Sequence, residues 1–161
     1  MGDVMGGAKR VFICPAHRDA IQMTNAVGFG DLVAFSYGYN IWGSGGGYQG
    51  LDGLNLGIGQ HVRESQVLVP SDMIAYGDSS DLGDYSLSVI IPTFGFDMGD
   101  YFWSWGPSKR HLNGANMLFC DGHVEYGRIR KWVEHRDDVM RRWNRDNQPH
   151  PESWLMDLTK Y

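Results

Sequence analysis

The sequence has few cysteines, no excess of positive charge and no long apolar run, and each absence excludes a class of protein. Only two of its 161 residues are cysteine, so it is not a small scaffold held together by many disulfides. Its formal net charge is −5, which argues against a nucleic-acid-binding protein. No segment approaches the ~20 apolar residues that cross a bilayer, and the first ten residues lack the apolar centre of a signal peptide.

The composition that remains is typical of one globular domain. Hydrophobic residues make up 42% and charged residues 20% of the chain, enough to form a core and too little charge for a disordered protein. We therefore expect a single domain over residues 1–161, with a C-terminal tail, residues 147–161, packed on its body. The 22 glycines gather mostly in residues 28–59 and 83–106, which predicts long, turn-rich loops.

The chain is organised around a predicted β-hairpin. Two short apolar segments, residues 116–120 and 123–126, are joined by an Asp-Gly pair. Asp-Gly between alternating segments is a strong hairpin signal, because a type I′ turn requires positive φ at both central residues. A two-residue loop would place Cys120 opposite His123. Alternation along the strands then gives the core face four side chains, Met117, Phe119, Val124 and Tyr126.

Three further segments carry regular patterns. Residues 31–42 alternate around aromatic side chains, which predicts a strand. Residues 73–78 form a short apolar run before an acidic turn, which predicts a central strand of the sheet. Apolar residues three, four and seven apart over residues 128–144 predict one amphipathic helix on the sheet. The sequence therefore predicts an α+β fold with a mainly antiparallel sheet, long Gly-rich loops and a C-terminal amphipathic helix.

The hairpin also carries a family resemblance. His111, nine residues, and then Asp121-Gly122 resemble the H-X9-DG signature of the prepilin-type processing-associated proteins, the pseudopilin-like family also known by its DUF1559 domain. The intervening NGANMLFC and the following HVE match the family style as well. Further resemblance lies in FICPAHR near the start, in PSDMIAYGDS over residues 70–79 and in RRWNRDNQPHPESW near the end.

This resemblance implies a fold and a role. The fold would be the globular head of a pilin-like protein. The role would be a non-catalytic structural or assembly component of a type II secretion-like or type IV pilus-like system at the bacterial cell envelope, periplasmic or extracellular. Its partners would be other pilin-like subunits or secretion-system components. The family's prepilin leader and long hydrophobic helix are not among these 161 residues.

Four residues near the motif form a candidate metal site: Asp78, His111, Asp121 and His123. If the strands before Asp78 and Asp121 end at one edge, the two carboxylates lie close together. Imidazole in such a set favours Zn²⁺, whereas carboxylates alone favour Ca²⁺. The structural alternative is that Asp121 caps the turn while His111 hydrogen-bonds its carboxylate and pins the loop.

The two cysteines, Cys14 and Cys120, are open to two interpretations. They could form a disulfide in an oxidising envelope compartment, or be unrelated core residues. As catalytic groups, Cys120 and His123 lack a third residue to orient the base. No G-x-S-x-G elbow surrounds the serines that follow Asp78. We therefore predict no enzymatic activity.

An aromatic, Gly-rich segment, residues 94–105, supports an alternative function. Its aromatic side chains either cap an open edge of the sheet or stack on a sugar or a partner. The second interpretation would make the protein a secreted carbohydrate-binding or recognition module with glycans as partners. The residues that would contact the ligand are Tyr101, Phe102, Trp103 and Trp105.

Overall fold

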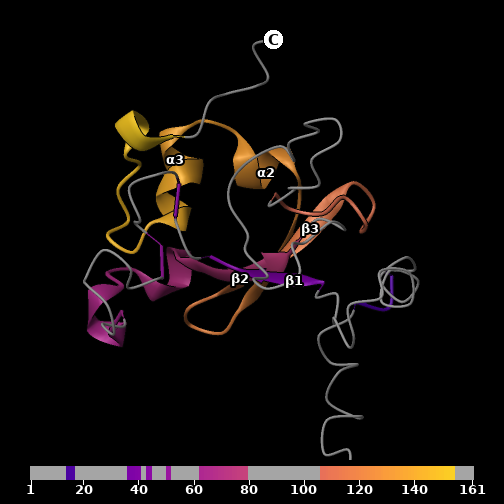
Figure 1. Cartoon of the computed structure of the whole chain (residues 1–161), viewed down its shortest axis with the longest axis horizontal. Coiled ribbons are helices and arrows are strands. Elements are labelled where there is room, and N and C mark those ends of the chain that lie inside the picture. The colour runs from indigo at the N-terminus through magenta and orange to yellow at the C-terminus, as the bar shows by residue number, and fades with distance from the viewer. Residues whose placement is uncertain are drawn as a thin grey trace, which may run out of the picture.

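The computed structural model describes residues 14–16, 36–40, 43–44, 50–51, 62–79 and 106–154. Within these ranges the chain forms a four-stranded antiparallel sheet and several short helices (Figure 1). The strands lie side by side in chain order: β1 (Tyr37–Tyr39), β2 (Ile74–Asp78), β3 (Gly114–Phe119) and β4 (Val124–Arg128). The predicted α+β class with an antiparallel sheet is confirmed for this part of the chain.

Strand β2 lies inside the sheet, between β1 and β3, as the apolar run of residues 73–78 predicted. Both neighbours are antiparallel to it. Ile74 pairs with Phe119, whereas Asp78, at the other end of β2, pairs with Tyr37. Asp78 and the hairpin turn that follows Phe119 therefore lie at opposite ends of the β2–β3 pair. The strand predicted over residues 31–42 is described only as β1, and its remaining residues lie largely outside the described ranges.

The hairpin of β3 and β4 has a different register from the predicted one. Leu118 pairs with Val124 and Met117 with Glu125. The loop has three residues, because the Phe119 N–H donates to the His123 carbonyl and the Gly122 N–H donates to the Phe119 carbonyl, each at 2.9 Å. Gly122 has φ +93°, as expected for a turn that ends in a left-handed glycine. The prediction of a two-residue type I′ loop is therefore wrong.

This shift by one residue changes which side chains share a face. Met117 and Phe119 are buried as predicted, but Val124 is 61% exposed and Tyr126 is 50% exposed. Opposite the buried part of β3, strand β4 instead presents the half-buried Glu125 and the backbone of Gly127. The prediction of the core face is therefore correct for the two β3 residues, Met117 and Phe119. It is wrong for the two β4 residues, Val124 and Tyr126, which are exposed.

The prediction of a single C-terminal helix over residues 128–144 is also wrong. The segment forms α2 (Arg130–Val133), α3 (Asp137–Met140) and the 3-10 turn η5 (Arg141–Trp143). Val133 and Val139 are separated by five polar residues, and a straight helix would turn them to different sides. Extended backbone at Glu134 and Arg136 interrupts the helix, so that both short helices bury apolar side chains.

Helices α2 and α3 lie together on one side of the sheet (Figure 1). The core between these layers consists of Ile74, Ala115, Met117, Phe119, Ile129, Trp132, Val133 and Trp143. The indole N–H of Trp132 donates to the Gly127 carbonyl at 3.0 Å, and that of Trp143 donates to the Trp132 carbonyl at 2.8 Å. A side chain at Gly127 would place its Cβ 2.8 Å from the Trp132 ring. The glycine is therefore required by close packing.

Two buried asparagines connect the sheet to the segments around it. The Asn40 amide donates to the carbonyls of Ile74 and Trp143, each at 2.8 Å. Asn144 accepts from the Ser44 N–H at 2.8 Å. The other helical elements within the described ranges are η3 (Glu64–Gln66), η4 (Pro70–Asp72) and η6 (Pro151–Ser153).

The C-terminal tail is described as far as Trp154. Its indole N–H donates to the Pro149 carbonyl, and its ring lies 5.3 Å from that of His135. Residues 155–161 lie outside the described ranges. Among the described residues, no helix has the length and apolar character that crossing a membrane requires.

Candidate metal centre

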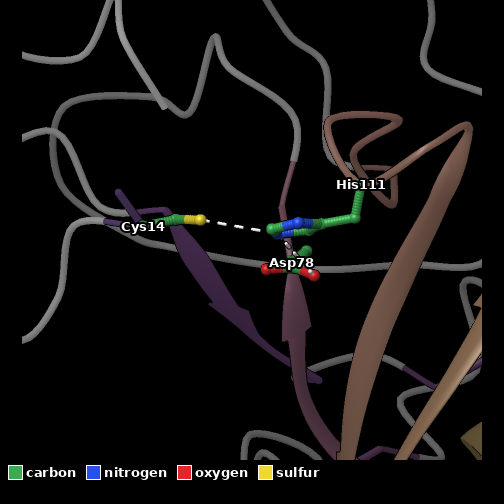
Figure 2. A group of neighbouring side chains, drawn as sticks. All are labelled: Cys14, Asp78 and His111. Atoms are coloured by element: carbon green, nitrogen blue, oxygen red, sulfur yellow. Dashed lines mark hydrogen bonds and ion pairs between the residues drawn. The ribbon is translucent and has the colours of Figure 1, made fainter. Parts of the chain in front are cut away.

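Three side chains from distant parts of the sequence meet at the carboxyl end of β2 (Figure 2). The Nε2 atom of His111 lies 3.4 Å from Cys14 Sγ and 3.5 Å from Asp78 Oδ2. One donor atom from each residue lies within 4.8 Å of the other two. Cys14 and Asp78 are buried, whereas the His111 side chain is 29% exposed. We call these three residues the Cys14 cluster.

Strand β3 holds the carboxylate of Asp78 in place. Both the backbone N–H and the side-chain amide of Asn116 donate to Asp78 Oδ2, at 2.7 Å and 2.9 Å. The Asp78 carbonyl accepts from the Ser108 N–H at 2.8 Å. These contacts fix the side chain at a buried position, where an unpaired carboxylate would be costly.

A tight turn presents His111. Its two central residues, Leu112 and Asn113, have φ of +50° and +61°, a conformation that is unfavourable for a leucine. The backbones of His111 and Gly114 close the turn through two hydrogen bonds. The Tyr126 hydroxyl also donates to the His111 carbonyl at 3.0 Å. The histidine is thus held by β3 and β4 while its ring reaches back to β2.

Cys14 lies beside the first strand. Burial raises the pKa of the neighbouring Tyr37 hydroxyl, and the charges of Cys14 and Asp78 and hydrogen bonding to Cys14 add to this effect. Arg110 acts in the opposite direction on Tyr37. The guanidinium Nε of Arg110 donates to Ser108 Oγ at 2.8 Å. The cluster therefore sits in a buried, polar corner of the sheet.

The geometry is unlike that of a catalytic triad. In a triad the nucleophile and the carboxylate contact different nitrogens of the histidine ring, so that the ring can pass a proton between them. Here the thiol and the carboxylate both approach Nε2 of His111. Three donor atoms that converge on one point are instead the arrangement of metal ligands, and this group could hold a metal ion.

The structure splits the four-residue metal site predicted from the sequence. Asp78 and His111 are together, but Asp121 and His123 lie at the opposite end of the β2–β3 pair, because the strands are antiparallel. The predicted closeness of Asp78 and Asp121 is therefore wrong. The predicted bond from His111 to the Asp121 carboxylate is also wrong, since that histidine contacts Cys14 and Asp78.

Asp121 and His123 form a separate, exposed pair in the hairpin turn. Asp121 Oδ1 accepts from the His123 N–H at 3.1 Å and contacts the ring Nδ1 at 2.6 Å. The predicted capping of the turn by Asp121 is confirmed. Hydrogen bonding to the backbone and the ring of His123 lowers the pKa of Asp121, and its hydrogen bond to Asp121 raises the pKa of His123. The His123 ring stacks on Phe119, with the ring centres 4.3 Å apart.

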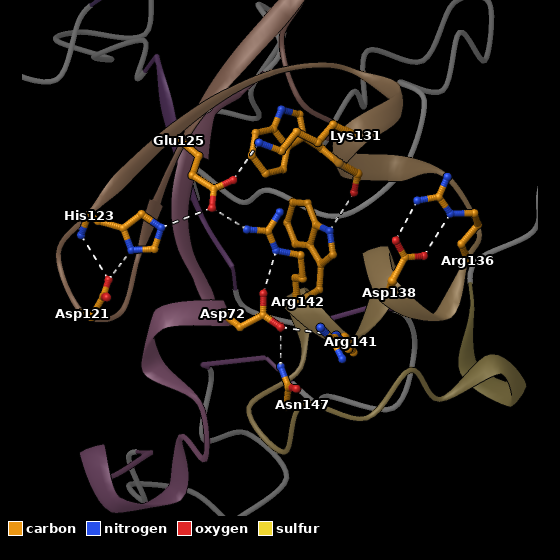
Figure 3. A network of polar contacts seen from close by, with 12 residues as sticks. Asp72, Asp121, His123, Glu125, Lys131, Arg136, Asp138, Arg141, Arg142 and Asn147 are labelled. Atoms are coloured by element: carbon orange, nitrogen blue, oxygen red, sulfur yellow. Dashed lines mark hydrogen bonds and ion pairs between the residues drawn. The ribbon is translucent and has the colours of Figure 1, made fainter.

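An ion-pair network continues from this pair toward the helices (Figure 3). Arg142 donates to Asp72 at 2.9 Å and to Glu125 at 2.8 Å, and Lys131 lies 2.7 Å from Glu125. Burial opposes ionisation of Glu125, but the hydrogen bonds from Lys131 and Arg142 outweigh it and lower its pKa to about 2. This end of the sheet thus has carboxylates that are already paired with cations.

The two cysteines are free thiols at opposite ends of β2, so, of the two interpretations that the sequence left open, the disulfide is wrong. The Cys120 N–H donates to the Met73 carbonyl at 2.9 Å, whereas Cys14 contacts His111. Burial and the charge of Asp121 raise the pKa of Cys120 to about 11. Sequence reasoning missed Cys14 as a partner of Asp78 and His111, although it lies in FICPAHR, one of the segments that carry the family resemblance.

The candidate ligand-contact residues of the aromatic segment, Tyr101, Phe102, Trp103 and Trp105, lie outside the described residues. Comparisons of the chain with family models, with curated proteins and with solved structures found no match.

Proposed function

We propose that this chain is the pseudopilin-like globular head of a non-catalytic structural or assembly component at the bacterial cell envelope. One observation carries the proposal. The segments FICPAHR, PSDMIAYGDS and H-X9-DG, on which the sequence resemblance rests, each contribute one residue to the Cys14 cluster. A resemblance spread over distant segments thus corresponds to one place in the fold. The antiparallel sheet behind the cluster agrees with a pilin-like head.

The geometry of the cysteines supports a non-catalytic role. The thiol and the carboxylate of the Cys14 cluster share one nitrogen of His111, which leaves no ordered path for a proton. The other thiol, Cys120, has its pKa raised to about 11, so at neutral pH it is protonated and a poor nucleophile. Cys120 therefore lacks the features of an activated nucleophile, and Cys14 contacts a histidine nitrogen that the Asp78 carboxylate also approaches.

An exposed apolar surface supports an assembly role. Leu112, Val124 and Tyr126 are 91%, 61% and 50% exposed, respectively. Val124 and Tyr126 lie on β4, at one edge of the described sheet, and the Tyr126 hydroxyl contacts the carbonyls of His111 and Leu112. Exposed apolar residues that gather on one face mark interaction sites. We propose this surface as the contact with another pilin-like subunit.

Binding between this chain and pilin-like proteins encoded in the same genome tests the proposal. We expect at least one of them to bind in a two-hybrid or pull-down assay, and the double variant Val124→Asp, Tyr126→Asp to weaken that binding at least tenfold. Leu68→Asp is the matched control, because Leu68 is 66% exposed but lies between η3 and η4. An in-frame prepilin leader upstream of the coding sequence would give independent support. Absence of binding to every such protein, together with absence of a leader, would overturn the proposal.

The alternative function, a secreted carbohydrate-binding or recognition module, stays a prediction from the sequence. It depends on the aromatic segment, which the described residues do not include. Glycan binding that is abolished by Trp103→Ala and Trp105→Ala would favour it over the assembly role.

A further inference from the structure

We propose that the Cys14 cluster is a Zn²⁺ site, in which Cys14 Sγ, His111 Nε2 and an Asp78 carboxylate oxygen are the three protein ligands and a water molecule completes the coordination. This inference does not depend on the assembly role, because it concerns the isolated chain.

The distances between the donor atoms fit this ion. In a tetrahedral site with Zn–S of about 2.3 Å and Zn–N and Zn–O of about 2.0–2.1 Å, neighbouring ligand atoms lie about 3.3–3.6 Å apart. The observed separations are 3.4 Å from Cys14 Sγ to His111 Nε2 and 3.5 Å from that nitrogen to Asp78 Oδ2. All three donor atoms lie within 4.8 Å of one another, so bringing the widest pair to the ideal spacing requires a movement of about 1.2 Å at most.

The types of donor select zinc over calcium. Calcium takes six to eight oxygen ligands, whereas this cluster offers a thiol, an imidazole and a carboxylate. Thiolate and imidazole together are typical of zinc. Binding requires the thiolate form, so Cys14 releases its proton to solvent when the sulfur–zinc bond forms.

The surroundings of the cluster are organised before any ion binds. Asn116 fixes the Asp78 carboxylate through two hydrogen bonds, as groups around metal ligands commonly do. The strained turn at Leu112 keeps His111 directed at β2, and strained backbone is retained where the surrounding structure requires it. The partial exposure of His111 leaves a route for the ion to enter.

The exposed pair of Asp121 and His123 is a poorer site for a cation. His123 lies between Asp121 and Glu125, and Glu125 already accepts hydrogen bonds from Lys131 and Arg142. A divalent ion there would have to approach two positive side chains. The same protein therefore supplies a matched internal control for the proposed site.

Cobalt substitution of the full chain is the direct test. The purified protein is freed of metal with a chelator and titrated with Co²⁺, which takes the same ligands and is visible by absorption. We expect about one Co²⁺ per chain, with a sulfur-to-cobalt charge-transfer band and intense tetrahedral d–d bands. Addition of Zn²⁺ should displace the cobalt. Co²⁺ binding without the charge-transfer band would show that no thiolate binds the ion, and would overturn the proposal.

Four variants locate the site. Cys14→Ser and His111→Gln should weaken Zn²⁺ binding at least tenfold, whereas Cys120→Ser and His123→Gln should leave it within about twofold. Circular dichroism of the metal-free variants shows whether they fold. Zn²⁺ binding that persists in folded Cys14→Ser, or that is lost in His123→Gln instead of His111→Gln, would overturn the assignment.

A measurement on the chain without substitutions tests the proposal even if the variants do not fold. Iodoacetamide labelling, located by mass spectrometry, should modify Cys14 at least tenfold more slowly in the presence of zinc. At a zinc concentration one hundred times the Kd, the melting temperature should rise by about 5–10 °C. Equal Cys14 labelling with and without zinc, together with an unchanged melting temperature, would overturn the proposal.

Discussion

Two aspartate–histidine pairs among the described residues, Asp78–His111 and Asp121–His123, lie at opposite ends of the β2–β3 pair and differ in burial and in partners. Asp78 is 1% exposed and lies 3.5 Å from His111, with Cys14 completing the group. Asp121 and His123 are each 38% exposed and lie 2.6 Å apart, in a turn that continues into an ion-pair network. The same residue types thus occur in a buried group of converging donors and in an exposed salt-bridge network.

This difference shows that the burial of an aspartate–histidine pair and its hydrogen-bond partners determine its chemistry. At the exposed end, the His123 N–H and water satisfy the Asp121 carboxylate, and its ion pair with His123 contributes little to stability. At the buried end, each polar atom depends on a few protein partners. Substitutions at the two ends should therefore have unequal effects, and four predictions test this comparison.

The largest expected effect is that of Asp78→Ala. The substitution leaves the part-buried Asn116 N–H without its carboxylate partner, so we expect the free energy of unfolding to fall by about 2–4 kcal/mol in urea titrations. Asp121→Ala, at the exposed end, should cause a much smaller loss. Equal losses for the two variants would remove the distinction between the two ends.

The next effect is that of Arg142→Met. Arg142 bridges Asp72 and Glu125 and lies over the Phe119 ring, 4.7 Å from its centre. Methionine retains apolar contact but removes the charge, so we expect a loss of about 1–2 kcal/mol by chemical denaturation. Arg136→Met is the control, since Arg136 pairs with Glu134 and Asp138 on the surface, and it should change stability little.

The third prediction concerns acid. Glu125 has its pKa lowered from 4.5 to about 2 in the folded chain, so its contribution to stability is fully present above about pH 4.5 and is lost as the pH falls toward 2. Urea midpoints measured between pH 5 and pH 2.5 should therefore decline, and Glu125→Gln should reduce this decline. An equally steep decline in Glu125→Gln would show that other carboxylates account for it.

The smallest effect is expected for Gly122→Ala in the exposed turn. Gly122 has φ +93° and no atom within 4 Å of an added Cβ, so the cost is only that of the left-handed backbone, about 1 kcal/mol in thermal or urea unfolding. Gly122→Asn should cost less, because asparagine tolerates this region better. A loss as large as that of Asp78→Ala would contradict the view that this turn is lightly constrained.

The sequence was sufficient to locate the central strand and the hairpin, but not the hairpin's register. Asp-Gly fits both a two-residue type I′ loop and the end of a three-residue loop with a left-handed glycine. What distinguishes them is contact with η4 and with Met73, the residue that follows it. Cys120 and Asp121 donate backbone hydrogen bonds to the carbonyls of Met73 and Pro70, and both partners lie about fifty residues away in the chain. The local sequence therefore cannot decide between the two loop types, because contacts with residues far away in the chain determine which one forms.

The break between α2 and α3 has a similar origin. The spacing of apolar residues agrees with a helix on either side of residues 134–136. The chain bends between the two helices because Trp132 and Trp143 both pack into the same core against the sheet. Arg136 lies at the break and contacts both Glu134 and Asp138 on the surface. Periodicity in the sequence therefore predicted the buried tryptophans but not the path of the backbone between them.

The sequence by itself predicted that this chain forms an antiparallel sheet and that β2 lies inside it, because these features depend on local preferences and alternation. It gave the capping of a hairpin turn by Asp121 as one of two interpretations. Only the tertiary structure decided which groups meet. Antiparallel pairing separates Asp78 from Asp121, and it brings Asp78 and His111 to Cys14, about a hundred residues before His111 in the chain. Residues far apart in a sequence become neighbours through strand direction and register, which no single segment encodes.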